Sequence, residues 1–424
     1  MTKSLTPLEA EERLLSLELF GMRFGLDRMR RLMTALDHPE QAFRSVHVVG
    51  TNGKSSTVRM LAAILTRHGH RTGAYLSPHL SSFCERIRVD DADVAPDRFA
   101  AAIERALRAA DQVNRGAVEG DVVTQFELLT AAAYSELAAR GVEFAVIEAG
   151  LGGRYDATNV ISSEVQMLTS VGLDHTRWLG SEIAEIAREK LDVVQPGAVL
   201  VLGPGMHPNA ESVAEQIAAE RGATMIRANA DPGVPVAALG AFQRRNFAVA
   251  LAAAEALLGA LDPTAVAAAA AQVRIPGRMH VTDERPLTVL DGAHNPDGIA
   301  ALVEALPEIV HDRRLVAVVS ILDDKDAATM LAGLVDGRVS VDGLVLTAAG
   351  NPRSLAPAKL RALVAALRET PAIVETCAEP HRALRRGRVL AGEDGVVVAT
   401  GSLYLVADLL ALADRSTGRR ASML

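Results

Sequence analysis

The most informative segment of the 424-residue chain reads His47-Val48-Val49-Gly50-Thr51-Asn52-Gly53-Lys54-Ser55-Ser56-Thr57. It continues a β-branched apolar run and opens a helical pattern, which predicts a strand, a glycine loop and a helix N-terminus in that order. Glycines let backbone N–H groups approach phosphate oxygens closely, and the helix N-terminus adds partial positive charge. Lys54 can then reach the terminal phosphates, and the hydroxyl of Ser55 or Ser56 can bind phosphate or magnesium. The segment therefore predicts a phosphate-binding loop.

The spacing of this loop departs from the usual G-x-x-x-x-G-K-[ST] pattern. Val48 stands where that pattern has its first glycine, so the loop is a shortened form. A chance glycine-rich turn is the alternative interpretation, which the order of strand, loop, lysine and helix disfavours. The residues expected to bind ATP here are Gly50, Thr51, Asn52, Gly53, Lys54, Ser55 and Ser56.

Short apolar runs alternate with longer helical patterns around the loop, such as the strand-like Phe144–Glu148 and the helix-like Ser55–His68. Alternating strands and helices imply a mostly parallel sheet with helices on both faces. The other strands expected in this first series are Ser45–Val49, Thr72–Leu76, Val165–Thr169 and Ala198–Leu202. The other helices are Phe126–Ala139, Glu182–Val194 and a segment around Ala267–Ala271 that Asp262-Pro263 introduces.

The alternation restarts after a turn-rich joint, Ile275-Pro276-Gly277-Arg278. The strands expected in this second series are Leu287–Asp291, Leu315–Ser320, Gly343–Thr347 and Gly395–Ala399. We therefore expect an α/β protein of two domains. The larger, residues 1–276, is a P-loop domain with a mostly parallel sheet flanked by helices, and the smaller, residues 277–424, is a Rossmann-like α/β domain.

Composition excludes several classes of protein. Asp and Glu total 52 against 44 Lys and Arg, and a net charge of −8 argues against an unspecialised nucleic-acid binder. The two cysteines, Cys84 and Cys377, lie far apart, which excludes a disulfide framework and fits a reducing compartment. Residues 1–20 suggest an amphipathic helix rather than a signal peptide, and no apolar run is long enough to span a membrane. We expect a cytoplasmic protein without nucleic-acid or membrane partners.

The shortened loop resembles that of the Mur ligase superfamily, which are ATP-dependent amide-forming enzymes. Within it, the chain resembles the folylpolyglutamate synthase/dihydrofolate synthase family from about Phe20 to about Leu409. One motif alone would be weak evidence, but many occur in the family's order. They are Leu76–Leu80, Glu85–Val89, Phe126-Glu127, Glu148–Asn159, Gly172–His175, Ala187–Lys190, Pro276–Arg278, Asp291–Pro296, Asp324–Asp326 and Gly401–Tyr404.

The resemblance implies a specific chemistry. A carboxylate resists attack by an amine, because its electrons oppose the attack and oxide is a poor leaving group. ATP removes this obstacle by phosphorylating the carboxylate, and the amine then displaces phosphate from the acyl phosphate. Positioning and charge neutralisation dominate such phosphoryl transfer. By resemblance, the catalytic residues are Lys54, Glu148, His175 and Lys190, acting with ATP and magnesium at two sites.

Candidate metal ligands follow the apolar strands. Glu148 ends one strand, and a carboxylate there faces the ligand crevice of an open α/β sheet, where oxygen ligands suit magnesium. A carboxylate that caps the following glycine loop is the alternative for Glu148, and a structural, hydrogen-bonding histidine is the alternative for His175. The resemblance implies that Ser77 and Glu148 hold one magnesium ion and that His175 holds a second.

Lys190 lies on the apolar stripe of its expected helix, about 20° from Ile183 at 100° per residue. A lysine there must extend its ammonium to solvent, find a partner or lose its charge. By resemblance, Lys190 is carbamylated and becomes an anionic group near the second metal. The family usually continues K-A-G-I, whereas Leu191-Asp192-Val193 follows here.

The remaining site residues are also implied by resemblance. Those expected to contact ATP, beyond the loop, are Asn246, Arg278, Asp291 and His294. Those expected to bind the acid substrate or glutamate are Phe24, Phe126, Glu127, Tyr155, Asp156, Ala157, Lys325 and Ser402. Taken singly, Arg278, Asp291 and His294 could equally be a helix-terminal arginine, a strand-end aspartate and a loop histidine. Arg23 replaces an aspartate that some dihydropteroate-using relatives carry.

The implied activity is ligation of L-glutamate to the carboxylate of dihydropteroate, of (poly)glutamyl tetrahydrofolate, or of both, by a monomer. A related alternative is a glutamyl ligase that acts on another small carboxylate, which Arg23 keeps open. A cell-wall Mur ligase is disfavoured because only 49 residues precede Gly50, too few for its nucleotide-sugar domain. A nucleotide-binding regulator that has lost catalysis is disfavoured because Lys54, Glu148, His175 and Lys190 are all present.

Overall fold

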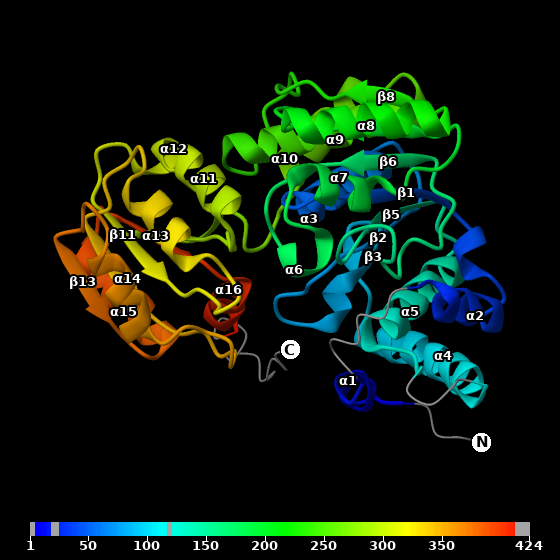
Figure 1. Cartoon of the computed structure of the whole chain (residues 1–424), viewed down its shortest axis with the longest axis horizontal. Coiled ribbons are helices and arrows are strands. Elements are labelled where there is room, and N and C mark those ends of the chain that lie inside the picture. Colours follow the sequence, from blue (N-terminus) through cyan, green and yellow to red (C-terminus); the bar gives the residue numbers. More distant parts are fainter. Residues whose placement is uncertain (1–4, 18–24, 117–120, 412–424) are drawn as a thin grey trace. The chain divides into compact units, whose positions relative to one another are not determined.

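The computed structural model describes residues 5–17, 25–116 and 121–411 of the chain (Figure 1). These residues form two compact units. The first contains the residues up to Pro235 together with Arg245–Val273, and the second contains Val236–Arg244 and the residues from Arg274 onward. The division between them passes through helix α9 (Ala241–Leu258) and again beside the joint at Ile275–Arg278.

The first unit is built on an eight-stranded sheet with the strand order β4-β3-β2-β5-β1-β6-β7-β8. The strands from β2 to β8 in this order are parallel, while β3 and β4 pair antiparallel at one edge. The strand bounds are β1 (Arg44–Val49), β2 (Thr72–Tyr75), β3 (Ile87–Val89), β4 (Ala92–Asp93), β5 (Phe144–Glu148), β6 (Val165–Leu168), β7 (Val199–Leu202) and β8 (Thr224–Arg227).

Helices cover this sheet. Helix α3 packs on β1, β2 and β5, while α7 and α8 pack on each other and share an apolar cluster with β6 and β7. The central strands are buried along their whole length, as parallel strands covered on both faces must be. The helices are α1 (Pro7–Leu15), α2 (Asp27–Ala35), α3 (Lys54–Arg67), α4 (Pro96–Arg115), α5 (Gln125–Ala139), α6 (Thr176–Leu179), α7 (Ile183–Leu191), α8 (Pro208–Arg221), α9 and α10 (Pro263–Gln272), with short 3₁₀ turns η1 (Pro39–Gln41) and η2 (Phe83–Arg86).

The second unit has a six-stranded sheet with the order β13-β12-β11-β14-β10-β9, parallel except for the antiparallel edge strand β9. Its core gathers apolar side chains from the sheet and from α11, α13 and α14. The strands are β9 (His280–Glu284), β10 (Leu287–Leu290), β11 (Leu315–Val319), β12 (Gly343–Leu346), β13 (Ile373–Thr376) and β14 (Val396–Thr400). The helices are α11 (Pro296–Ala305), α12 (Pro307–Val310), α13 (Ala327–Val335), α14 (Pro357–Ala365), α15 (Pro380–Ala391) and α16 (Leu403–Leu410).

The predicted fold class is confirmed, and local signals set several boundaries. Asp262 caps α10 by accepting a hydrogen bond from the backbone N–H of Thr264, as the Asp-Pro pair predicts. Two helices are shorter than predicted. Within residues 5–17 the N-terminal helix covers only Pro7–Leu15, and α7 ends at Leu191 rather than Val194. Among the described residues, no helix is long and apolar enough to cross a membrane.

Candidate active site

The phosphate loop joins β1 to α3 at the carboxyl edge of the first sheet. Gly53 adopts a left-handed backbone (φ +86°) at the N-cap of α3, and a Cβ there would lie 2.5 Å from Oδ1 of Asn246. The loop therefore needs glycine at this point, and Asn246 of α9 lies directly against it. The first N–H groups of α3 have no carbonyl partner within the helix, which makes this terminus an anion site.

The side chain of Lys54 folds back onto the same loop. Its Nζ donates to the carbonyl oxygen of Gly50 at 3.0 Å and to that of Thr51 at 3.3 Å. The backbone N–H groups of Thr51 and Asn52 instead donate to Ser170, which follows β6. Of the predicted loop residues, Gly53–Ser56 present the helix terminus, whereas Thr51 and Asn52 use their N–H groups within the protein.

Glu148 joins three elements beside the loop. Its buried carboxylate accepts a hydrogen bond from the Ser55 hydroxyl at 2.9 Å and from the backbone N–H of Ser77 at 3.1 Å. The predicted residues Ser77 and Glu148 are thus brought together with the first turn of α3. Hydroxyl and carboxylate oxygens are the donors that magnesium prefers, and the ion usually completes its shell with water and phosphate oxygens. The donor set therefore fits a magnesium ion bound with a nucleotide.

His175 lies on a different segment, at the N-cap of α6, with an exposed side chain. Its Nε2 is 3.9 Å from an Asp174 carboxylate oxygen, and its backbone N–H donates to the same oxygen at 2.9 Å. Within the described ranges, no three His, Cys, Asp or Glu side chains gather into a metal-binding group. A second metal site at His175 stays a prediction.

Lys190 is buried, as its position on the apolar stripe of α7 predicts. Its Nζ donates to the Gly50 carbonyl oxygen at 3.0 Å, the same oxygen that Lys54 contacts. Burial lowers the pKa of Lys190 to about 7, and repulsion from Lys54 adds to the effect. A substantial fraction of this amine is therefore neutral near pH 7.

Two of the predicted acid-substrate residues already have their carboxylates engaged. Asp156 is buried and accepts from the backbone N–H groups of Leu151 (2.7 Å) and Thr158 (3.0 Å) and from the Thr158 hydroxyl. Burial raises the pKa of Asp156, although these donors oppose the shift. Asp156 thus organises the loop that follows Glu148, where Tyr155 is exposed and Ala157 is buried.

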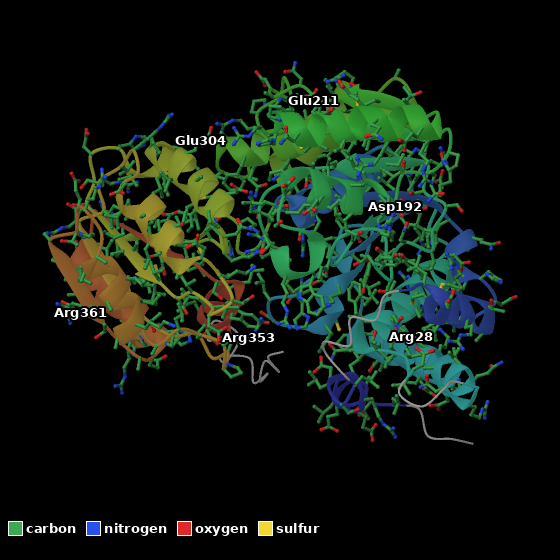
Figure 2. All side chains as sticks on the ribbon, in the orientation of Figure 1. Arg28, Asp192, Glu211, Glu304, Arg353 and Arg361 are labelled. Carbon is green, nitrogen blue, oxygen red and sulfur yellow. The ribbon has the colours of Figure 1, made fainter. Side chains whose placement is uncertain are left out.

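Glu127 is engaged in the same way at the start of α5. Its carboxylate accepts from the N–H and hydroxyl of Thr124, both at 2.9 Å, and from Nε of Arg28 at 3.0 Å. Arg28, which is labelled in Figure 2, also pairs with Asp121 at 2.6 Å. A capping box explains the Thr124–Glu127 contact from sequence, but no local pattern indicated Arg28. The neighbouring Phe126 lies against Gly150, where a Cβ would be 2.5 Å from the Phe126 ring. Phe24 lies outside the described residues.

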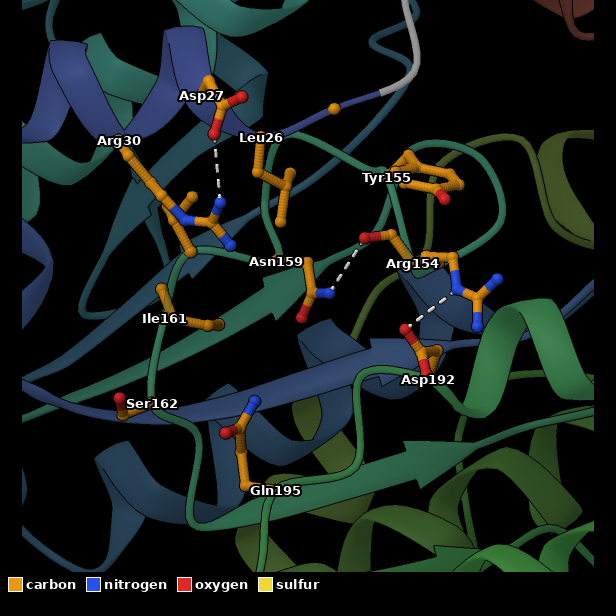
Figure 3. A pocket seen from close by; sticks show the side chains of 12 residues that line it. Leu26, Asp27, Arg30, Arg154, Tyr155, Asn159, Ile161, Ser162, Asp192 and Gln195 are labelled. Atoms are coloured by element: carbon orange, nitrogen blue, oxygen red, sulfur yellow. Dashed lines mark hydrogen bonds and ion pairs between the residues drawn. The ribbon is translucent and has the colours of Figure 1, made fainter.

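A polar pocket of about 610 Å³ opens beside the loop that follows Glu148 (Figure 3). Of the predicted site residues, Tyr155 lines it; the residue is 43% exposed, and the Arg154 guanidinium lies 5.7 Å from its ring centre. Two ion pairs lie on its walls, Arg30–Asp27 at 3.2 Å and Arg154–Asp192 at 3.0 Å. The catalytic candidates Lys54, Glu148 and Lys190 do not line it.

In the second unit, three predicted residues meet at the turn after β10. Arg278 Nη1 and His294 Nδ1 both contact the Gly292 carbonyl oxygen, at 3.0 and 2.8 Å. Asp291 is buried and accepts from the N–H groups of Met279 (2.8 Å) and Ala293 (2.9 Å), and its burial raises its pKa. Ser402 caps α16 by accepting from the Tyr404 N–H at 3.1 Å. Lys325 lies on the loop between β11 and α13.

Comparison with known proteins gives a family match and close relatives. The family "Mur ligase, glutamate ligase domain" matches residues 277–403. The dihydrofolate synthase/folylpolyglutamate synthase of Mycobacterium tuberculosis is 36% identical over 370 residues, which cover 78% of this chain and 75% of that protein.

Solved structures agree along nearly the whole chain. The folylpolyglutamate synthase of Mycobacterium tuberculosis complexed with ADP has a TM-score of 0.88 at 30% identity and covers 98% of this chain and 99% of its own. The bifunctional folylpolyglutamate synthase/dihydrofolate synthase of Yersinia pestis with Mn, AMPPNP and L-glutamate bound has a TM-score of 0.82 at 30% identity, covering 97% and 100%.

Proposed function

Because the chain belongs to the folylpolyglutamate synthase/dihydrofolate synthase family of the Mur ligase superfamily, we propose that it uses ATP to join L-glutamate to a pteroate or folate carboxylate. The observation that carries this proposal is the convergence of Lys54, Ser55, Ser77 and Glu148 at one helix N-terminus. The ADP in one similar structure, and the Mn, AMPPNP and L-glutamate in another, support the same assignment.

The first step is phosphorylation of the acid. The N-terminus of α3 and the Lys54 ammonium would hold the β- and γ-phosphates, which places positive charge where the transferred phosphoryl group develops negative charge. Ser77 and Glu148, with Ser55, would hold a magnesium ion, which supplies charge neutralisation when bound. The carboxylate oxygen of the acid attacks the γ-phosphorus, the bond to the β-phosphate oxygen breaks, and ADP leaves.

The second step forms the amide. The glutamate amine attacks the acyl carbon, and the C–O bond to phosphate breaks as the amine loses a proton. We assign the ATP and acid substrate to residues 1–276 and glutamate to residues 277–424, where Lys325 and Ser402 would seat it. Arg278 and Asp291 would contact ATP, and His294 would lie close to its phosphate or to the glutamate. Exclusion of water protects the acyl phosphate from hydrolysis.

Lys190 supports a finer proposal. A neutral buried amine can attack carbon dioxide through its Nζ lone pair, forming an N–C bond and releasing one proton. The product is an anionic carbamate beside the phosphate loop. With His175, it would provide oxygen and nitrogen ligands for a second divalent ion, and its negative charge would remove the repulsion between Lys190 and Lys54.

The experiment that tests the function offers two acids separately. Purified protein is incubated with ATP, Mg²⁺ and L-glutamate plus either dihydropteroate or tetrahydrofolate, and products are read by mass spectrometry. We expect a glutamyl unit to be added to at least one acid, and far less product with Lys54→Ala over the same time. If ATP is hydrolysed but neither acid gains glutamate, the substrate is another small carboxylate and the proposal is wrong.

We further propose that the enzyme acts as a monomer in the cytoplasm. Two cysteines without a disulfide support a reducing compartment. Size-exclusion chromatography with light scattering should give one species near 44.8 kDa, the mass of one chain. A species of twice that mass would contradict the monomer.

A further inference from the structure

Two loops meet at the carboxyl edge of the first sheet, and each accepts hydrogen bonds from backbone N–H groups of the other. One is the phosphate loop after β1, and the other is Thr169–Gly172 after the neighbouring strand β6. Backbone pairing brings Val49 opposite Leu168, so the two loops leave the sheet side by side. The residues that then join them are about 120 positions apart in the sequence.

Ser170 closes on the peptide groups of Asn52. Its hydroxyl oxygen accepts a hydrogen bond from the Asn52 N–H at 2.9 Å, and the hydroxyl donates to the Asn52 carbonyl oxygen at 3.1 Å. The Ser170 carbonyl oxygen in turn accepts from the Thr51 N–H at 2.8 Å. One serine therefore engages three backbone groups of the phosphate loop.

Thr51 repeats this arrangement in the opposite direction. Its hydroxyl oxygen accepts from the Gly172 N–H at 3.0 Å, and the hydroxyl lies 3.3 Å from the Gly172 carbonyl oxygen as a donor. Gly172 begins the segment that ends at His175. Each loop thus gives one hydroxyl that holds the peptide groups of the other loop. We call Thr51, Asn52, Ser170 and Gly172 the hydroxyl clasp.

The backbones around the clasp leave no room for adjustment. A Cβ on Gly50 would lie 2.0 Å from the Thr169 hydroxyl oxygen, and one on Gly203 would lie 2.2 Å from the Thr169 carbonyl oxygen. The Thr169 hydroxyl also contacts the Asn52 carbonyl oxygen at 2.7 Å. The loop after β6 therefore passes closely between Gly50 and Gly203, which fixes its position relative to the phosphate loop.

We propose that Thr51 and Ser170 are positioning residues that lock the phosphate loop to the Gly172–His175 segment, and that neither hydroxyl contacts the nucleotide. Both hydroxyls already serve as donor and acceptor to backbone groups, so phosphate recognition would begin at Gly53. The consequence for catalysis rests on the proposed function. In that reaction, the clasp would hold the segments that carry Glu148 and His175 at fixed positions before substrates bind. Binding would then not cost the entropy of ordering these segments.

The test compares variants that differ by one hydroxyl. Thr51→Val and Ser170→Ala each remove one side of the clasp, and Thr51→Ser restores the hydroxyl without the methyl group. Thr34→Val is the matched control, because Thr34 donates to the Arg30 carbonyl oxygen on α2, outside the site. Binding of ADP with Mn²⁺ is measured by calorimetry, and amide hydrogen exchange is measured on the nucleotide-free protein.

We expect Thr51→Val and Ser170→Ala to weaken ADP binding about tenfold each, since one or two hydrogen bonds are lost. The double variant should lose less than the product of the two effects, because both act through one clasp. Exchange should accelerate at Gly172 in Thr51→Val and at Asn52 in Ser170→Ala, without nucleotide present. Thr51→Ser should stay within about threefold of the wild type.

Three outcomes would overturn the proposal. Weaker ADP binding with unchanged exchange would make Thr51 a direct nucleotide contact. A loss in Thr51→Ser as large as that in Thr51→Val would show that the hydroxyl by itself does not hold the clasp. Unchanged ADP binding in both single variants would show that the clasp positions nothing. None of these measurements needs glutamate ligation, so failure of the proposed function would be seen separately, as absence of product.

Discussion

The carboxyl edges of the two sheets hold their polar residues in different ways. At the first edge, candidate site residues bond to segments roughly 70 to 140 positions away, as Glu148 does with Ser77 and Lys190 does with Gly50. At the second edge, the contacts described above span 14 positions or fewer, as Arg278 and His294 do with Gly292 and Ser402 does with Tyr404. This difference agrees with the proposal that the first edge binds the highly charged nucleotide, and a change there should disturb several loops. Changes at the second edge should stay local.

The largest effect in this comparison is expected for Lys54→Ala, at the first edge. Loss of the cation beside the transferred phosphoryl group should lower kcat for ATP-dependent ligation about 100- to 1,000-fold. The measurement is steady-state ADP release with the accepted pteridine and glutamate present. Lys359→Ala, an exposed residue of α14, is the control and should match the wild type. Retention of more than a tenth of wild-type kcat would contradict the role of Lys54.

A second test separates the ligands of the two edges. Lys325→Ala should raise KM for L-glutamate about tenfold or more, because a charged partner of a carboxylate is lost. The dissociation constant for ADP should stay unchanged, since the phosphate loop belongs to the other unit. Calorimetry with ADP and an initial-rate series in glutamate give both values. A weakened ADP complex with an unchanged KM for glutamate would reverse the assignment.

A third test uses the buried amine of the first edge. The pKa of Lys190 falls from 10.5 in the unfolded chain to about 7 in the folded protein through burial. Between these values the unfolded state binds more protons, so the free energy of unfolding should rise from about pH 7 to about pH 10, relative to Lys190→Met. Urea denaturation in carbon dioxide-free buffer measures the difference. Lys359→Met controls for removal of a surface charge, and a flat difference for Lys190→Met would contradict the shifted pKa.

The smallest effect is expected at the second edge. Ser402→Ala removes the side-chain cap of α16 and should lower the free energy of unfolding by about 1 kcal/mol. The ADP dissociation constant should not change, because the lost hydrogen bond is local. Chemical denaturation and calorimetry check both statements. A tenfold loss of ADP affinity would show that the second edge is not local in its effects.

Local sequence patterns were sufficient for the interior strands of both sheets except β3, which was not predicted. The strands predicted at 45–49, 144–148, 315–320 and 395–399 lie in the sheet interiors, where buried β-branched runs give a clear signal. The edge strands β4, β8, β9 and β13 were not predicted. Their residues are largely exposed or half-buried, so their apolar pattern is weak.

The sequence by itself determined the phosphate loop, the alternation of strands and helices, the place of Lys190 on the apolar stripe of its helix, and the family. These follow from spacing along the chain, which local chemistry encodes directly. Only the tertiary structure decided that Arg28 engages Glu127 and that Ser170 and Thr51 lock two loops together. The physical reason is that strand order and helix packing, rather than spacing along the chain, bring these partners together. A hydroxyl or carboxylate has the same local pattern whether its partner is a ligand or a backbone amide 120 residues away.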